Sequence, residues 1–457
     1  RDKKLNHANT FLVSNNCFPQ TIDVIRTRAE SLGIKLKIID IHNASFSEDV
    51  FGIIVQYPEK YGLINDYSKL VKTAHKNNCL VTVAADLLSL TLLTPPGEFD
   101  VDIVVGSSQR FGIPLGYGGP HAAYFATKEE FKRSVPGRII GLSNDIDGKK
   151  AYRMALQTRE QHIRREKATS NICTSQVLLA VMASMYAVYH GPLKLKKIAQ
   201  NIHNYTCILS NALFTLGFKQ LNEYFFDTIL IDTQEISVKN IKVYAEDAKM
   251  NFNYISDNLI SISIDEKDDK TNIKDILKVF AKSKNYPDID VMIEKIMANP
   301  NEICKIPHTL IRKSSFLNYD VFNSHHSETD LMRYIKSLEN KDLSLTHSMI
   351  PLGSCTMKLN AAAELFSLSS TNFSNIHPFA PSNQARGYHI MFHELEEALC
   401  KITGMESVSL QPNSGAQGEY AGLMVIKKYH EFNDDKNRNI CLIPSSAHGT
   451  NPASAIM

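Results

Sequence analysis

The sequence of 457 residues lacks three features that mark secreted, membrane-spanning or nucleic-acid-binding proteins. Its eight cysteines include no CxxC pair, which favours reduced thiols in a reducing compartment over disulfides. The longest apolar stretch, residues 177–189, is shorter than the ~20 residues that a membrane helix needs. A formal net charge of +2 offers no excess of one sign for binding nucleic acid or a membrane surface. We therefore expect neither nucleic acid nor membrane as a partner.

The sequence also lacks an initiating methionine and any signal or transit pattern, since it begins at Arg1. It stops at Met457, directly after a loop where further strands would be needed to close a sheet. We expect an internal fragment of a longer protein. Its length suggests two or three domains, and its 43% hydrophobic and 21% charged content is ordinary for a globular chain.

Short apolar runs alternate with helix-forming segments in the first part of the chain. Strands are expected at residues 10–13, 36–41, 51–55, 79–84, 103–105 and 122–126, and helices at residues 22–32 and 67–76. Each strand is a continuous apolar run, as is typical of strands that are buried on both faces. The pattern predicts an α/β fold with a doubly wound parallel sheet.

Further along, residues 151–189 are expected to be largely helical and to carry five basic side chains. These are Arg159, His162, Arg164, Arg165 and Lys167. They could bind an acidic group, but interleaved Glu160 and Glu166 favour a solvated, salt-bridged face. Residues 193–300 combine a helix at 193–216 with strands at 225–231 and 259–264, which predicts a smaller α+β domain.

A small-residue turn at residues 411–419 (QPNSGAQGE) joins an apolar run at 408–410 to a helix expected at 420–430. Free N–H groups at such a helix start, together with the helix dipole, form a seat for a phosphate or carboxylate. Gly415 and Gly418 let the backbone approach the bound oxygens closely. The alternative is a tight turn without a ligand.

A second loop, residues 445–454, follows a buried-strand pattern at 439–444 and contains His448. Ligand sites of open α/β sheets lie at the carboxyl ends of neighbouring strands, so the two loops are expected to face one crevice. The imidazole of His448 is then placed to lie flat on an aromatic cofactor ring. The alternative is an ordinary hydrogen-bonded loop histidine.

A helix expected at residues 384–402 carries His389, His393 and Glu396 at metal-ligand spacing. No HExxH is present, and a polar outer face explains these residues equally well, so we expect no metal. The helix should end at Gly404. Its expected buried residues are Met391, Leu395, Ala398 and Ile402.

Four long motifs resemble one family. They are residues 157–165 (QTREQHIRR) with 167–173 (KATSNIC), residues 351–360 (PLGSCTMKLN), residues 411–419, and residues 447–454 (AHGTNPAS). Together they resemble the glycine-decarboxylating P proteins of the glycine cleavage system, and the resemblance covers essentially the whole chain. It implies the pyridoxal-phosphate-dependent transferase fold type I, which is aspartate-aminotransferase-like, built here as two homologous halves that are both truncated.

The family implies five regions. These are a large α/β domain of a non-catalytic first half (1–150), a helical connector (151–192), a small α+β domain (193–300), a linker and arm with an active-site loop (301–383), and the start of the catalytic large domain (384–457). The implied reaction is pyridoxal 5'-phosphate-dependent decarboxylation of glycine, with transfer of the aminomethyl group to the lipoyl group of the H protein. The implied partners are glycine, the lipoylated H protein and the other glycine cleavage proteins, with a homodimer at full length. The expected location is the cytoplasm in a bacterium, which we favour, or the mitochondrial matrix in a eukaryote.

The resemblance also assigns site residues. The phosphate seat corresponds to Ser414, Gly415, Ala416 and Gln417. His448 corresponds to the residue stacked on the cofactor ring, with Thr450 beside it. Cys355 and Thr356 lie in the loop that resembles the active-site entrance.

The family's Schiff-base lysine and the aspartate that contacts the ring nitrogen are expected beyond Met457. The first half carries a degenerate copy of the lysine loop with Gln109 in the lysine's place, and a carboxamide cannot form a Schiff base. The first half also departs from the family at Phe18, where a histidine is usual. Lys167 and Lys358 stand outside the lysine motif, so no catalytic residue is assigned and the fragment itself is expected to be inactive.

Two other functions compete with this assignment. A non-catalytic scaffold subunit that pairs with a separate catalytic chain is the main alternative, but it would end before the second phosphate loop. Another fold-type-I enzyme, such as a desulfurase or a hydroxymethyltransferase, does not account for the motifs at 157–173 and 351–360.

Overall fold

The computed structural model describes residues 8–164, 176–286, 290–291, 293–294, 306–344, 347–349, 361, 363–435 and 437–456. The chain divides into two compact units. Unit 1 comprises Arg1–Ile113, Ala123–Ala126 and Ala180–Phe366, and unit 2 comprises Pro114–Ala122, Thr127–Leu179 and Ser367–Met457. The five regions expected from the family remain a prediction.

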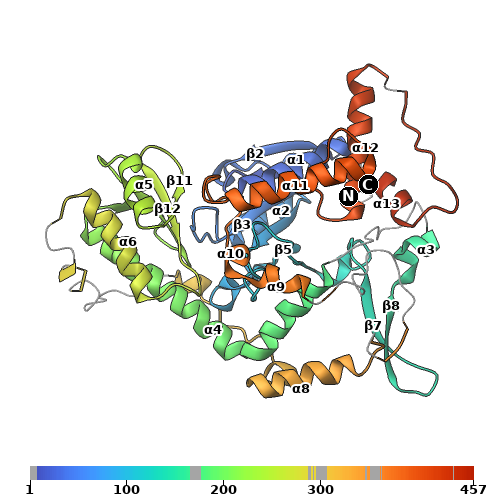
Figure 1. The fold of residues 1–457 in the computed structure, drawn as a ribbon, viewed down its shortest axis with the longest axis horizontal. Helices are drawn as coiled ribbons and strands as arrows, with labels where there is room; N and C mark the ends of the chain where they lie inside the picture. Colours follow the sequence, from blue (N-terminus) through green and yellow to red (C-terminus); the bar gives the residue numbers. More distant parts are fainter. Residues whose placement is uncertain are drawn as a thin grey trace. The chain divides into compact units, whose positions relative to one another are not determined.

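A six-stranded sheet forms the centre of unit 1, with its strands in the order β2-β1-β3-β4-β5-β6 (Figure 1). The strands are β1 (Thr10–Ser14), β2 (Lys35–Ile39), β3 (Val50–Tyr57), β4 (Leu80–Ala85), β5 (Ile103–Ser107) and β6 (Ala123–Thr127). The pairs from β2 through β5 are all parallel. The six strands expected from the apolar runs are confirmed, with ends that differ by a few residues.

Two helices connect the first strands of this sheet. Helix α1 (Pro19–Ser31) has proline in its first turn, where the missing N–H costs nothing. It is followed by Gly33, whose φ of +64° suits a residue without a Cβ. Helix α2 (Ser68–Lys76) buries Val71 and Ala74, one turn apart on one face. Both helices match the expected positions.

A four-stranded antiparallel sheet forms the smaller part of unit 1, in the order β11-β12-β10-β9. Its strands are β9 (Lys219–Gln220), β10 (Thr228–Asp232), β11 (Asn253–Tyr254) and β12 (Leu259–Ser263). Helices α5 (Val238–Asp247) and α6 (Lys270–Ser283) lie side by side against it (Figure 1). Side chains of both sheets, among them Val83 of β4 and Ile229 of β10, belong to one buried apolar cluster. This part of unit 1 thus combines helices with an antiparallel sheet, and the expected α+β domain at residues 193–300 remains a prediction.

The long helix α4 (Val177–Thr215) consists of two segments that meet at Gly191 (Figure 1). Gly191 has φ +60° and ψ 178°, and Pro192 starts the second segment. A Cβ on Gly191 would lie 2.5 Å from the carbonyl oxygen of Phe322, so this bend requires glycine. Helix α8 (Glu328–Glu339) follows later in unit 1, capped by the Ser327 side chain.

The expectation of a helical segment from residue 151 is wrong at its start. Strands β7 (Ile139–Asn144) and β8 (Lys150–Ala155) form an antiparallel hairpin in unit 2, and a 3-10 helix (Gln157–Arg159) and the short helix α3 (Gln161–Arg164) follow before residue 165. Helix-forming residue types in β8 pair instead with β7, because cross-strand packing overrides local propensity.

The prediction of a solvated basic face is also wrong at Arg159, which is only 3% exposed. Its guanidinium donates hydrogen bonds to the carbonyl oxygens of Arg133, Val135 and Gly137. Glu160 is equally buried, whereas Arg164 is exposed as expected. Residues 165–167 lie outside the described residues.

Unit 2 ends in helices rather than in a sheet. They are α9 (Glu364–Ser369), which starts in unit 1, α10 (Thr371–Ser374), α11 (Arg386–Thr403), α12 (Gly415–Phe432) and α13 (Thr450–Ile456). Residues 408–410 and 439–444, both described, form no strand, and Ile440 and Leu442 are 83% and 91% exposed. The strand predictions are wrong because a strand needs a hydrogen-bonded neighbour, which these segments do not have among the described residues.

Helix α11 lies where it was predicted and ends at Gly404, which has φ +72°. Its predicted burial is wrong, because Met391, Leu395, Ala398 and Ile402 are all exposed. An amphipathic helix is buried only where a second apolar surface covers it, and the expected sheet is not formed here.

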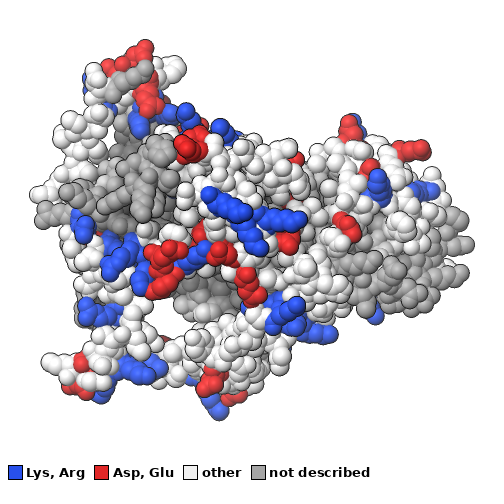
Figure 2. Space-filling view, turned by 180° about the vertical axis from the view of Figure 1, so that it is seen from behind, with Lys and Arg blue, Asp and Glu red and all other residues white. Residues whose placement is uncertain are grey.

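The described helices include none that combines the length and the hydropathy needed to span a bilayer. On the face shown in Figure 2, acidic and basic side chains are interspersed over the described surface.

Candidate functional site

The start of helix α12 has the local geometry of an anion seat. Ser414 is the N-cap with an extended backbone, and its Oγ accepts a hydrogen bond from the Gln417 N–H at 3.3 Å. The helical ladder begins with the Gly418 N–H, which donates to the Ser414 carbonyl at 2.9 Å. The N–H groups of Gly415 and Ala416 precede this ladder and belong to the positive end of the helix dipole.

Two further observations fit an anion at this position. The first turn of α12, all of it described, carries no acidic residue that would compensate the helix dipole. No heavy atom of the described residues lies within 4 Å of the position that a Cβ on Gly415 would take. The backbone N–H groups are therefore approachable, and a phosphate or a carboxylate is the chemistry that they suit.

The loop before helix α13 fixes the imidazole of His448. The Thr450 N–H donates to Nδ1 of His448 at 3.2 Å, and the Thr450 hydroxyl lies 2.5 Å from the same nitrogen. Because a backbone N–H can only donate, Nδ1 is the acceptor and the proton of the neutral ring is on Nε2. Thr450 is buried, whereas the ring of His448 is exposed.

Helices α12 and α13 pack against each other within unit 2. The Ser454 hydroxyl donates to the Glu419 carboxylate at 3.2 Å, which joins the second turn of α12 to the last turn of α13. Neighbouring strands were expected to bring the two loops together, but a helix–helix contact does so here. The assignment of Ser414, Gly415, Ala416, Gln417, His448 and Thr450 to cofactor binding stays a prediction.

The remaining candidates lie either outside the described residues or on helix α11. Cys355 and Thr356, like Lys167 and Lys358, lie outside the described residues. On α11, His393 pairs with Glu397 at 3.3 Å and His389 lies 3.4 Å from the Tyr117 hydroxyl. The two histidines therefore have separate partners.

Gln109 follows β5, at the carboxyl edge of the six-stranded sheet, and its side chain is bonded within its own loop. Its Nε2 donates to the carbonyl oxygen of Ile113 at 2.8 Å, and the Ile113 N–H returns a bond to the Gln109 carbonyl at 3.1 Å. The Gln109 side-chain amide thus helps to close the turn at residues 109–113.

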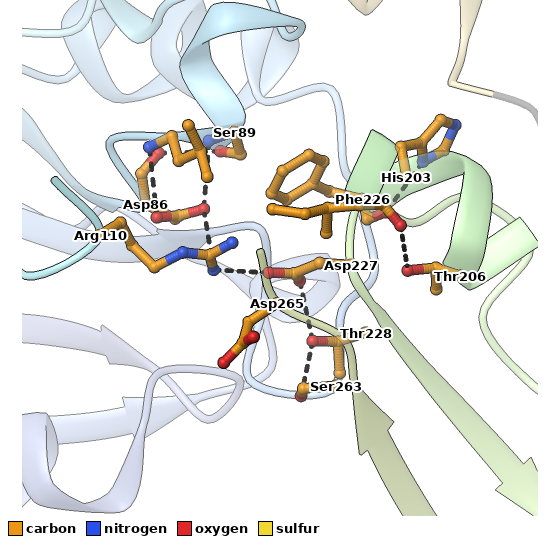
Figure 3. A network of polar contacts seen from close by, with 12 residues as sticks. Asp86, Ser89, Arg110, His203, Thr206, Phe226, Asp227, Thr228, Ser263 and Asp265 are labelled. Carbon is orange, nitrogen blue, oxygen red and sulfur yellow. Dashed lines mark hydrogen bonds and ion pairs between the residues drawn. The ribbon is translucent and has the colours of Figure 1, made fainter. Parts of the chain in front are cut away.

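Sequence reasoning missed a charged cluster beside Gln109 (Figure 3). Arg110 lies 2.6 Å from Asp227 and 3.6 Å from Asp86, measured from its Nη1 to one carboxylate oxygen of each. Burial raises the pKa of Asp86, and the Arg110 guanidinium opposes that rise. Burial alone would lower the pKa of Arg110, but the two carboxylates raise it above its usual value. The available signal was a charged residue shortly after each of two neighbouring strands, Asp86 directly after β4 and Arg110 after Ser108 and Gln109 beyond β5.

Gln109→Lys is expected to gain no stoichiometric pyridoxal phosphate adduct after borohydride reduction. The new ammonium group can donate to the Ile113 carbonyl as Gln109 does, and Arg110 fills the neighbouring space. Peptide mapping by mass spectrometry after reduction measures the adduct. A stoichiometric adduct within residues 100–125 of the wild type or of Gln109→Lys would contradict the prediction that this edge of the sheet does not bind the cofactor.

Comparisons with known proteins agree on one family. Residues 1–280 match the family model described as glycine cleavage system P-protein. The chain is 55% identical over 452 residues to the glycine dehydrogenase (decarboxylating) of Nostoc punctiforme, which covers 99% of this chain and 46% of that protein. It is 55% identical over 459 residues to that of Christiangramia forsetii, which covers 100% of this chain and 47% of that protein. The chain thus spans about half the length of these curated relatives.

A solved structure supports the same assignment. The crystal structure of glycine decarboxylase (P-protein) of the glycine cleavage system, in inhibitor-bound form, matches with a TM-score of 0.56 and 28% identity. The match covers 60% of this chain and 66% of that chain. The expected α/β fold of type I is therefore confirmed. Because the family model matches more than half of the sequence and two relatives match nearly all of it, the chain belongs to the glycine cleavage system P-protein family.

Proposed function

We propose that this chain acts within a pyridoxal-phosphate-dependent enzyme that decarboxylates glycine and transfers the aminomethyl group to the lipoyl group of an H protein. The observation that carries the proposal is the Ser414-capped start of α12, packed beside the helix that follows His448. It occurs in a chain 55% identical to proteins named glycine dehydrogenase (decarboxylating).

The residues present suit the phosphate of the cofactor. The N–H groups of Gly415 and Ala416 stand at the start of α12 with open space in front of Gly415. The Ser414 hydroxyl accepts from Gln417 and keeps its own proton available for donation to a phosphate oxygen. Binding here would fix one end of the cofactor and thereby orient its ring.

His448 suits the flat face of that ring. Thr450 holds Nδ1 of the imidazole through its N–H, so the ring plane is set before any ligand arrives. A preset, exposed aromatic plane can stack on a second ring without first losing rotamer freedom. When bound, pyridoxal phosphate would supply the ring that draws in the electrons of the broken C–C bond.

The assembly and location follow from the same proposal. The partners are glycine, a lipoylated H protein and the other glycine cleavage proteins, and the complete protein is a homodimer. The bacterial sources of the two relatives support the cytoplasm as the location.

Ser414→Ala in the complete polypeptide is expected to weaken pyridoxal phosphate binding roughly 10-fold, because one hydrogen bond to a charged oxygen is lost. Affinity is measured by titration of the cofactor absorbance. Activity is measured as exchange of labelled bicarbonate into the glycine carboxyl with lipoylated H protein present. His448→Ala should also lower both.

Ser409→Ala is the matched control. Ser409 lies just before the same turn, and its Oγ accepts a hydrogen bond from the nearby Gln411 N–H at 3.3 Å. It should bind the cofactor like the wild type. Equal cofactor affinity in Ser414→Ala and Ser409→Ala would refute the phosphate seat, and absence of exchange in the wild type would refute the reaction.

A further inference from the structure

The carboxyl edge of β4 and β5 holds a partly buried ionic cluster that the proposed function does not use (Figure 3). Asp86 follows β4, Arg110 follows β5, and Asp227 directly precedes β10 of the four-stranded sheet. One nitrogen, Arg110 Nη1, lies 3.6 Å from Asp86 Oδ2 and 2.6 Å from Asp227 Oδ2. Side-chain exposure is only 22% for Arg110, 21% for Asp86 and 13% for Asp227. The cation therefore links the two sheets of unit 1.

Both carboxylates are held in place by other groups. Asp86 accepts hydrogen bonds from the backbone N–H groups of Leu88 and Ser89, at 3.3 and 3.1 Å. Asp227 accepts from the Thr228 hydroxyl at 2.9 Å, and that hydroxyl lies 2.9 Å from the Ser263 hydroxyl of β12. The two acceptors are thus fixed independently of Arg110, and they form a cradle for a planar cation.

Neighbouring groups lie close together at this edge of the sheet. The Tyr124 hydroxyl donates to the Ala85 carbonyl at 2.8 Å, across the end of β4. A Cβ on Gly106 would lie 2.3 Å from that same carbonyl oxygen, so the strands approach as closely as glycine permits. The Phe226 ring lies 5.8 Å from the Arg110 guanidinium carbon. Carboxyl edges of open α/β sheets are where ligands usually bind, and here Arg110 lies at that edge between Asp86 and Asp227.

We propose that Arg110 is an internal cation that links the six-stranded sheet to the four-stranded sheet and closes this edge to ligands. The carboxylates of Asp86 and Asp227 form a site for a planar cation such as guanidinium. The Arg110 side chain occupies this site. The proposal stands on the ion-pair geometry and is independent of cofactor binding at α12.

The arginine is sensitive to loss of a partner. Its Nε and Nη2 are buried and have no hydrogen-bond partner in the part of the chain that the structure describes. Its charge is compensated through Nη1, next to both aspartates. Conversely, removal of Arg110 leaves two aspartates near each other in a desolvated place, and an unpaired buried charge costs more than the pair contributes.

The test is a double-mutant cycle in the complete polypeptide, read as the thermal midpoint. Arg110→Ala and Asp227→Asn should each lower the midpoint by roughly 5–10 °C. In the Arg110→Ala background, Asp227→Asn should instead raise the midpoint, because it removes one of two uncompensated charges. If Asp227→Asn lowers the midpoint equally in both backgrounds, the proposal is overturned.

Arg26→Ala is the matched control, because Arg26 pairs with Asp23 on the surface with exposures of 46% and 70%. It should change the midpoint by no more than about 1–2 °C. A midpoint for Arg110→Ala equal to that of Arg26→Ala would also overturn the proposal.

Chemical rescue tests occupancy of the cradle directly. Guanidinium chloride at millimolar concentration, compared with equal potassium chloride, should raise the midpoint of Arg110→Ala along a saturable curve. The double variant with Asp227→Asn should not respond. Hydrogen exchange at β10 and β12 should accelerate in Arg110→Ala and slow again with guanidinium. A response that is equal in both variants, or absent from both, contradicts a cation cradle.

Discussion

Gly62→Ala is expected to lower the free energy of unfolding of unit 1 by more than about 4 kcal/mol. Few kinds of single substitution cost this much. Gly62 has φ +88°, and a Cβ there would lie 2.0 Å from the carbonyl oxygen and 2.8 Å from the carbonyl carbon of Thr228. Thr228 begins β10, and its carbonyl accepts a hydrogen bond from Asn222 at 2.9 Å. The overlap is with backbone that is itself held in place, so neither partner can move without loss of the strand.

Gly33→Ala separates the two causes of that loss. Gly33 has φ +64°, but no heavy atom of the described residues lies within 4 Å of the added Cβ. The Gly33→Ala variant should lose only the stability that a left-handed backbone costs an alanine, about 1–2 kcal/mol. Urea unfolding of both variants measures the difference, which is the contribution of the close approach to β10. Equal losses in the two variants would mean that the contact with Thr228 relaxes freely.

Phe280→Ala is expected to cost about 3–5 kcal/mol, because it empties the centre of the smaller part of unit 1. Phe280 on α6 is 0% exposed. Its ring centroid lies 5.1 Å from that of Phe218, edge to face, and 5.7 Å from that of Phe252. Loss of the ring removes these aromatic contacts and leaves a cavity between α6 and the four-stranded sheet.

Phe214→Ala provides the comparison for the same chemical change. Phe214 lies near the end of α4 with 76% of its surface exposed, so its removal should alter stability by about 0.5 kcal/mol or less. Because the chain contains no tryptophan, chemical unfolding of both variants is followed by far-ultraviolet circular dichroism. A Phe280→Ala loss no larger than that of Phe214→Ala would show that the aromatic cluster does not stabilise this sheet.

The strands of unit 1 could be predicted because their signal is local. A strand that is buried on both faces is mostly apolar, as in β3, and the connecting helices carry their own start and stop residues. The hairpin of β7 and β8 was missed for the opposite reason. Residues 151–155 are acceptable in a helix, and only pairing with residues 139–143 makes them a strand.

The contacts of the candidate site also differ in how far apart their residues lie in the sequence. The Ser414 cap and the His448–Thr450 contact join residues two or three positions apart, so the sequence predicts where they are. The Arg110–Asp227 pair joins residues 117 positions apart, and neither neighbourhood reveals the other. Burial of α11 failed as a prediction because an amphipathic pattern identifies an apolar face without identifying what covers it.

The ionic cluster also bears on how this edge of the sheet can change during evolution. A single substitution at Gln109 would restore a primary amine, but Arg110 would still occupy the cradle of Asp86 and Asp227. Loss of Arg110 first would leave two buried carboxylates without a counter-ion, and selection removes such destabilised proteins. Each single step is either without effect or harmful. Gain of ligand binding at this edge therefore requires two changes together, which single substitutions under selection do not reach.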